Sequence, residues 1–185
     1  MANLWAKLYK WAGWKTEITV PRLDKCVICV APHTSNWDFI AGIFAYKSLG
    51  RQANFLMKEF WFFWPLKYLL RRLGGIPVPS RRGSGGKGSL TERIIEALGT
   101  HDYMNLAVTP EGTRSCRSDW RHGFLYIAYG AKVPIQLAVI DYRTRTAIIK
   151  EQFTPTGDVE ADMANVKNYY AQWKDAAKYP EKFCI

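Results

Sequence analysis

The chain has 185 residues, of which 48% are hydrophobic, and a net charge of +10. This length is typical of a single domain with one core, and the hydrophobic content excludes an intrinsically disordered chain. The 8 Trp, 10 Tyr and 9 Phe residues, together with the positive charge, suit an anionic membrane surface, an anionic small substrate or nucleic acid.

The N-terminal segment predicts a short helix. Its apolar residues recur at helical spacing: Leu4, Trp5, Leu8, Trp11 and Ala12. Lys7 and Lys10 lie off that stripe, as in helices that bind a membrane surface. These lysines interrupt any signal-peptide core, and no later apolar run reaches about 18 residues, so we expect neither a signal peptide nor a membrane-spanning segment. We therefore predict that residues 1–16 form an amphipathic membrane-associating helix ahead of a single domain over residues 17–185.

Strands and helices alternate along the rest of the chain. We expect strands at residues 18–20, 26–31, 54–57, 75–79, 106–109, 133–140 and 146–150. We expect helices at residues 38–49, 90–98, 121–130 and 158–173, and an apolar segment with a basic end at residues 60–72. This alternation is typical of an α/β domain in which a layered sheet is flanked by helices. In such domains the chemistry gathers at the carboxyl ends of the strands.

The four cysteines are Cys26, Cys29, Cys116 and Cys184. Cys26 and Cys29 form a C-x-x-C, but they fall inside an apolar run that predicts a buried strand, whereas a redox pair belongs at a helix N-terminus. No second C-x-x-C is present to complete a zinc site. We interpret these cysteines as core fillers in a reducing compartment.

A histidine and an aspartate follow the first strong strand, with Pro32 between the strand and the histidine. His33 and Asp38 can meet only if His33 lies in the loop and Asp38 in the first turn of the next helix, because five helical residues would separate them by about 140°. Ser35 supports this arrangement, since it is a good N-cap with an acidic residue three positions later. Asp38 could then orient one imidazole nitrogen and leave the other free to take a proton. The alternative is that Asp38 only caps the helix.

A second polar cluster, residues 111–114, follows the strand at residues 106–109. Gly112 would let the backbone approach a ligand closely, and Arg114 offers a planar fork that matches phosphate or carboxylate. The alternative interpretation is a surface turn with an exposed ion pair.

Together these clusters resemble the acyltransferase family that includes lysophosphatidate and glycerol-3-phosphate acyltransferases. That family carries four blocks in order: H-x4-D, a Gly-Ile-Pro-Val-like stretch with a basic residue after it, E-G-T-R, and a V-P-I-like stretch. The corresponding residues here are 33–38, 74–78 with Arg81 and Arg82, 111–114, and 133–135. The resemblance covers about residues 25–140, and it implies that residues 17–185 are an acyltransferase domain with a glycerol-3-phosphate acyltransferase-like fold.

The resemblance implies a role for each matching residue. His33 is expected to be the general base and Asp38 to orient it. The residues expected to bind substrate are Lys58, Arg81, Arg82, Glu111, Gly112, Thr113 and Arg114. Among these, Lys58 matches a family Lys-Glu pair and is a candidate donor to the oxyanion, while the E-G-T-R block is expected to bind the phosphate of the acceptor. The donor is expected to be a thioester of coenzyme A or acyl carrier protein, and neither a metal nor a cofactor is required.

One departure from the family pattern bears on the acceptor. The second block usually ends in an Asp-Arg pair, but Pro79 and Ser80 occupy those places, and Arg81 and Arg82 follow. The expected acceptor is a lysolipid, most simply 1-acyl-glycerol-3-phosphate, with a lyso-aminolipid as the competitor. Two further functional classes compete with acyl transfer: a non-catalytic lipid-binding protein of the membrane surface, and an esterase that uses water.

The clustered aromatics predict attachment to a membrane. Trp residues favour the headgroup region, and basic residues flank both the N-terminal segment and residues 60–64. The alternative is that residues 60–64 belong to a core helix, since apolar stretches of about 10–14 residues are often core. We expect a peripheral protein on the cytoplasmic face of the membrane. We expect no nucleic-acid partner, because no recognised nucleic-acid module accompanies the basic loop at residues 81–87.

Overall fold

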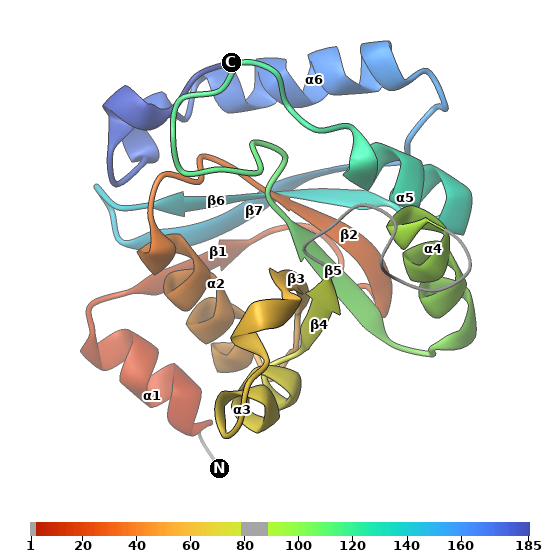
Figure 1. The fold of residues 1–185 in the computed structure, drawn as a ribbon. Helices are drawn as coiled ribbons and strands as arrows, with labels where there is room; N and C mark the ends of the chain where they lie inside the picture. The colour runs from red at the N-terminus through yellow and green to blue at the C-terminus, as the bar shows by residue number, and fades with distance from the viewer. Residues whose placement is uncertain (1–2, 79–88) are drawn as a thin grey trace.

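The computed structural model of the chain describes residues 3–78 and 89–185. The described part is a mixed α/β domain built on a seven-stranded sheet (Figure 1). The strands are β1 (Lys15–Ile18), β2 (Lys25–Val30), β3 (Asn54–Lys58), β4 (Gly75–Val78), β5 (Met104–Val108), β6 (Ile135–Asp141) and β7 (Thr146–Phe153). The helices are α1 (Leu4–Trp11), α2 (Asn36–Ser48), α3 (Leu66–Arg72), α4 (Leu90–Thr100), α5 (Gly123–Ala131) and α6 (Val159–Ala171), with short 3₁₀ turns η1 (Glu59–Trp61), η2 (Lys174–Ala176) and η3 (Pro180–Lys182). The predicted single α/β domain is confirmed.

The strand order is β1-β7-β6-β2-β5-β3-β4. The strands β6, β2, β5, β3 and β4 all run parallel, while β7 is antiparallel to β6 and β1 is parallel to β7. The carboxyl ends of the five parallel strands therefore lie along one edge of the sheet. The segments that leave these ends carry the polar clusters singled out in the sequence.

Helices cover both faces of the sheet, because the buried central strand is apolar on both sides. On one face, Val27 and Cys29 of β2 join a core cluster with residues of α4, α5 and α6. On the other face lie α1 and α2, and there Cys26 and Ile28 pack near Tyr46 of α2. Figure 1 shows these two helical layers on either side of the strands.

The N-terminal helix is packed onto the domain. Tyr9 is buried in a cluster with residues of α2 and β6. Trp5 contacts the ring of Phe44 edge-on, with 5.0 Å between the ring centres. The large hydrophobic residues of α1 that remain exposed are Leu4, Leu8 and Trp11. The expected boundary at residue 16 falls inside β1, which is itself a strand of the sheet.

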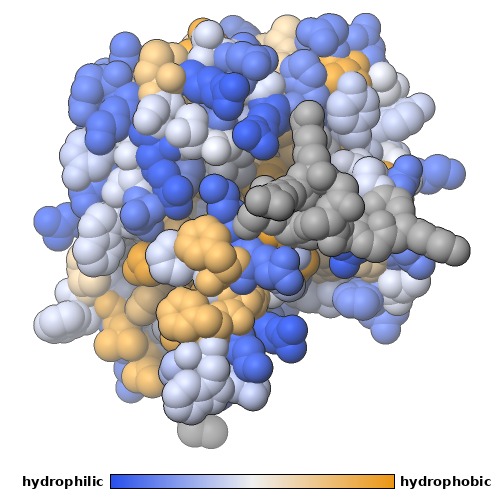
Figure 2. Space-filling model, in the orientation of Figure 1, coloured by the Kyte–Doolittle hydropathy of each residue, from blue (hydrophilic) through white to orange (hydrophobic). Residues whose placement is uncertain are grey.

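The aromatic segment at residues 60–64 is not a core helix, so that alternative is wrong. The chain forms the turn η1, breaks before Pro65, and resumes as α3. The exposed fractions of Phe60, Phe63 and Trp64 are 58%, 55% and 74%. In Figure 2, hydrophobic side chains gather on the lower part of the visible face, over α2 and the segment that leads into α3. Within the described ranges, none of the helices is long and apolar enough to cross a membrane.

The cysteines divide into two pairs. Cys26 and Cys29 are free and buried in β2, as the strand pattern predicted. Cys116 and Cys184, 68 residues apart, form a disulfide between the loop after β5 and the C-terminus. This bond does not fit the reducing compartment expected from Cys26 and Cys29, because structural disulfides persist in oxidising surroundings.

Candidate active site

The loop after β2 and the start of α2 place a histidine beside an aspartate. Ser35 is the N-cap of α2: its hydroxyl accepts from the N–H of Trp37, and Asp38 accepts from the N–H of Ser35 in return. This capping box fixes Asp38 in the first turn, as predicted, and turns its carboxylate back toward the loop that holds His33.

His33 and Asp38 are in contact. The Nδ1 atom of His33 lies 3.1 Å from Oδ2 of Asp38, although the N–H does not point along a straight hydrogen bond. Nδ1 is buried and makes no hydrogen bond of good geometry, so Asp38 is its neighbour by distance alone, and Nε2 has no partner among the described residues. A carboxylate beside Nδ1 favours the tautomer whose Nε2 carries a free lone pair. This arrangement can therefore accept a proton at Nε2.

Asp38 is held by more groups than the sequence predicted. Its Oδ2 accepts hydrogen bonds from the backbone N–H groups of Thr34 and Ser35, both at 2.9 Å. Its Oδ1 accepts from the hydroxyl of Tyr142 at 2.8 Å. Tyr142 directly follows β6, so the parallel register of β6 and β2 brings it to the same edge of the sheet. No motif marked Tyr142, and the only signal was its place after a strand.

Glu111 lies beneath the site rather than on its surface. Its side chain is fully buried, and Oε1 accepts a hydrogen bond from the backbone N–H of His33 at 2.7 Å. Burial raises the pKa of Glu111 to about 7, the hydrogen bond from His33 opposes this rise, and the nearby Asp38 adds to it. The buried Oε2 has no partner among the described residues. The hydrogen bond to Glu111 therefore supports the His33 loop, and burial keeps the Glu111 carboxylate away from a ligand.

The rest of the E-G-T-R cluster forms a turn with an exposed arginine. Gly112 has φ +64°, and a Cβ added there would come within 2.7 Å of Nε of Arg121, so this turn requires glycine. The Thr113 hydroxyl accepts from the N–H of Ser115 at 3.3 Å. Arg114 is exposed and makes no ion pair within the described ranges, so its guanidinium is available to an anion.

The remaining predicted residues follow neighbouring strands. Lys58 is the last residue of β3 and is exposed, at the same edge as His33. β3 is hydrogen-bonded to β5, the strand that leads to Glu111. Arg81 and Arg82 lie outside the described residues.

The C-terminal segment closes over the loop that carries His33. The Tyr179 N–H donates to the hydroxyl of Thr34 at 3.2 Å, and the Tyr142 N–H donates to the carbonyl of Ala176 at 2.9 Å. The Lys178 ammonium lies 5.3 Å from the ring centre of Trp37 and 5.8 Å from that of Tyr142. These residues come from far along the chain, and no sequence pattern singled them out.

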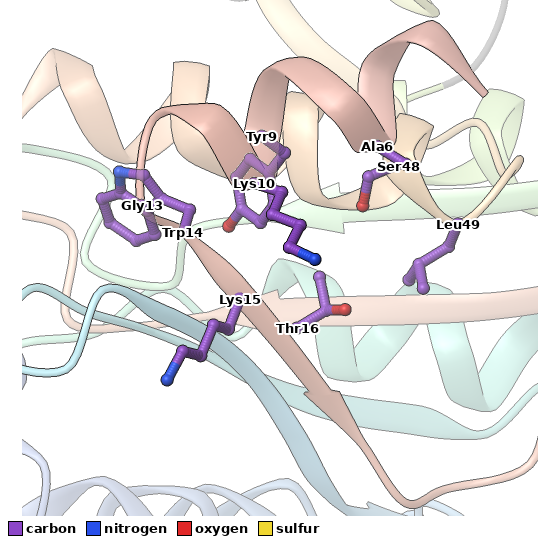
Figure 3. A pocket seen from close by; sticks show the side chains of 9 residues that line it. All are labelled: Ala6, Tyr9, Lys10, Gly13, Trp14, Lys15, Thr16, Ser48 and Leu49. Atoms are coloured by element: carbon purple, nitrogen blue, oxygen red, sulfur yellow. The ribbon is translucent and has the colours of Figure 1, made fainter. Parts of the chain in front are cut away.

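A surface hollow lies elsewhere, between α1, β1 and the end of α2 (Figure 3). Tyr9, Lys10, Trp14, Thr16 and Leu49 are among the residues that line it, and it contains none of the predicted site residues. In the part of the chain that the structure describes, no three His, Cys, Asp or Glu side chains come together in a way that could hold a metal ion.

Comparison with known proteins identifies one family. A family model described as Acyltransferase matches residues 15–141. This range contains β1 through β6 and the clusters at His33, Asp38 and Glu111. No curated protein matches the chain.

Proposed function

The chain belongs to the acyltransferase family of lysophosphatidate and glycerol-3-phosphate acyltransferases, and from that premise we propose that it transfers a fatty acyl group from a thioester to a hydroxyl of a lysolipid. The observation that carries the proposal is the contact of 3.1 Å between Nδ1 of His33 and Oδ2 of Asp38, which leaves Nε2 unpartnered among the described residues. This arrangement supplies a base, which a hydroxyl acceptor requires.

In the proposed reaction the acceptor oxygen attacks the thioester carbonyl carbon while Nε2 of His33 takes the hydroxyl proton. The tetrahedral intermediate then collapses, the carbon–sulfur bond breaks, and the imidazolium returns its proton to the departing sulfur. Ester and thiol are the products, and no covalent acyl-enzyme is formed. A thiol has a pKa of about 8.5, so its thiolate leaves with little acid assistance.

The developing oxyanion needs a hydrogen-bond donor. We assign this role to Lys58 or to backbone amides of the site, because Lys58 ends the strand two places from β2 at the same edge of the sheet. A lysine there would stabilise negative charge on the carbonyl oxygen more in the transition state than in the ground state.

The proposed acceptor carries an anionic head group. Arg114 is exposed three residues after Glu111, which contacts the His33 loop, and it makes no described ion pair. A guanidinium matches phosphate or carboxylate through two hydrogen bonds. We take 1-acyl-glycerol-3-phosphate as the first candidate. A lyso-aminolipid is the second, because Pro79 and Ser80 replace the Asp-Arg pair that the family usually carries after its second block.

We further propose that the protein works as a peripheral protein on a membrane. The support is the set of exposed apolar side chains on α1, on the segment leading into α3 and on α3 itself: Leu4, Leu8, Trp11, Phe60, Trp61, Phe63, Trp64 and Leu69. Exposed basic residues, among them Lys7, Arg71 and Arg72, flank these side chains. Apolar insertion and attraction to anionic lipids would act together.

The experiment that tests the proposal is product analysis by mass spectrometry. The protein is incubated with a mixture of lysolipids, each with acyl-coenzyme A or acyl-loaded carrier protein, beside a His33→Ala control. We expect a new diacyl product that the control does not make, and its head group and acyl mass identify acceptor and donor. Net loss of ester without a new lipid would indicate an esterase, and no change in any lipid would overturn the proposal.

A further inference from the structure

We infer that Tyr142 is a positioning residue for the general base, acting through Asp38. Its hydroxyl fixes the second oxygen of the carboxylate whose first oxygen contacts His33. The inference rests on the proposed function, because it takes His33 to be the base.

The carboxylate of Asp38 has every oxygen engaged. Oδ2 receives the N–H groups of Thr34 and Ser35 and lies beside Nδ1 of His33. Oδ1 is left for the Tyr142 hydroxyl, which donates to it at 2.8 Å. Because Asp38 is only 3% exposed, water cannot readily replace a donor that is lost there. Tyr142 therefore prevents the carboxylate from rotating about its Cβ–Cγ bond and shifting the oxygen that faces the imidazole.

Tyr142 is suited to donate rather than to accept. Burial, and after it the hydrogen bond with Asp38, raise the pKa of the Tyr142 phenol well above its ordinary value. The phenol therefore keeps its proton at neutral pH. A neutral donor can stabilise the ionised carboxylate without removing its negative charge.

The Tyr142 ring is itself held from both ends of the chain. Trp14, between α1 and β1, contacts it edge-on with 5.4 Å between ring centres. The Ala176 carbonyl accepts its backbone N–H at 2.9 Å, and the Lys178 ammonium lies over the ring at 5.8 Å. A tyrosine fixed at three points has little freedom to withdraw its hydroxyl from Asp38. Tyr142 also lies one residue beyond the range that matches the family model, so the family pattern does not supply this contact.

A merely structural role for Tyr142 would affect folding, whereas a positioning role affects turnover in a way that depends on Asp38. The test measures transfer by Tyr142→Phe, Asp38→Asn and the double variant, with purified full-length protein. Tyr103→Phe is the matched control, because that hydroxyl donates to the Gln52 carbonyl at 2.9 Å just before β5, at the opposite edge of the sheet. All assays are run at a temperature at which circular dichroism shows every variant to be folded.

We expect Tyr142→Phe to lower kcat by about 10- to 100-fold with both KM values unchanged, while Tyr103→Phe stays near the parent. In the Asp38→Asn background, Tyr142→Phe should cost nothing further, because the contact it removes is already altered. Equal kcat for Tyr142→Phe and Tyr103→Phe, or independent and multiplying losses in the double variant, would overturn the inference. Full transfer by His33→Ala in the same assay would instead overturn the proposed function, so the two failures are distinguishable.

Discussion

The buried carboxylate of Glu111 accepts a hydrogen bond from the backbone N–H of His33 at 2.7 Å, joining residues that are 78 apart in the sequence. The loop between β2 and α2 is therefore fixed twice. It is joined covalently to β2, and it is hydrogen-bonded to Glu111, which follows β5. Because this carboxyl group is buried, its protonation should affect the stability of the fold.

The first prediction concerns the pH dependence of that stability. The pKa of Glu111 is raised from 4.5 to about 7 in the folded protein, chiefly by burial. Between these values the folded state binds more protons than the unfolded state, so the free energy of unfolding falls as pH rises through this window. Glu111→Gln should remove a dependence of about 3 kcal/mol between pH 4.5 and 8. Urea unfolding at both pH values measures it, with exposed Glu151→Gln as control, and parallel profiles for Glu111→Gln and the parent would contradict the prediction.

The second prediction concerns the base. His33→Ala should reduce transfer by about 10²- to 10⁴-fold, because a general base supplies that much of the rate. The protein should still fold, since Asp38 is the one polar contact of the imidazole within the described ranges. Asp38→Asn should reduce transfer less but lower stability by about 1 kcal/mol or more, because two backbone N–H groups depend on its carboxylate. Thermal melts beside the rate measurements separate the two effects, and unfolded His33→Ala protein would contradict this assignment.

The third prediction concerns the acceptor. Arg114→Ala should raise the acceptor KM at least about 10-fold and leave the donor KM unchanged, because a bidentate contact to an anionic head group is lost. Arg117→Ala is the matched control, since Arg117 is exposed in the same loop. If the donor KM alone rises, Arg114 binds the thioester donor and not the acceptor. Separate Arg81→Ala and Arg82→Ala variants show which of these arginines contributes to the same site.

The fourth prediction concerns the membrane. Trp11 and Trp64 are 87% and 74% exposed, so Trp11→Ser and Trp64→Ser should each weaken binding to anionic vesicles about 10-fold without lowering the melting temperature. Tyr126→Ser, on exposed α5 surface, should leave vesicle binding unchanged. High salt should weaken binding only in part, since it screens the basic residues and not the apolar insertion. Normal vesicle binding by both tryptophan variants would contradict a membrane role for this surface.

These substitutions are a sharper test than removal of residues 1–14. Tyr9 is buried against α2, and Trp14 contacts Tyr142, so truncation should destabilise the domain and abolish activity on every acceptor. The sequence alone predicted a membrane-associating helix ahead of the domain, because a repeat of Trp and Leu at helical spacing is the same for a helix on a membrane and a helix on a protein.

The sequence predicted the local parts of the site and missed the distant ones. The capping box at Ser35 and Asp38 is encoded within four residues, so their meeting with His33 could be anticipated. Tyr142 could not be, because its contact with Asp38 depends on β6 lying beside β2, and strand order is set by packing of the whole sheet. The disulfide between Cys116 and Cys184 was missed for the same reason, since nothing local brings together residues 68 apart.

For the aromatic segment the sequence favoured exposure at a membrane but left a core helix open. An apolar stretch of this length is compatible with both a core helix and an interfacial segment. The outcome depends on the break before Pro65, which divides η1 from α3 and turns Phe63 and Trp64 outward. Hydropathy depends only on the composition of such a segment, whereas its burial depends on whether other parts of the chain pack over it.

The hydrogen bond from Tyr179 to Thr34 has a consequence for how the protein is made. It joins residues 145 positions apart, and Thr34 belongs to the loop between His33 and Asp38. Because synthesis runs from the N-terminus, Tyr179 and the Ala176 carbonyl that holds Tyr142 leave the ribosome long after Thr34. We therefore expect the nascent chain to remain without activity until Tyr179 has emerged and can reach the loop at Thr34.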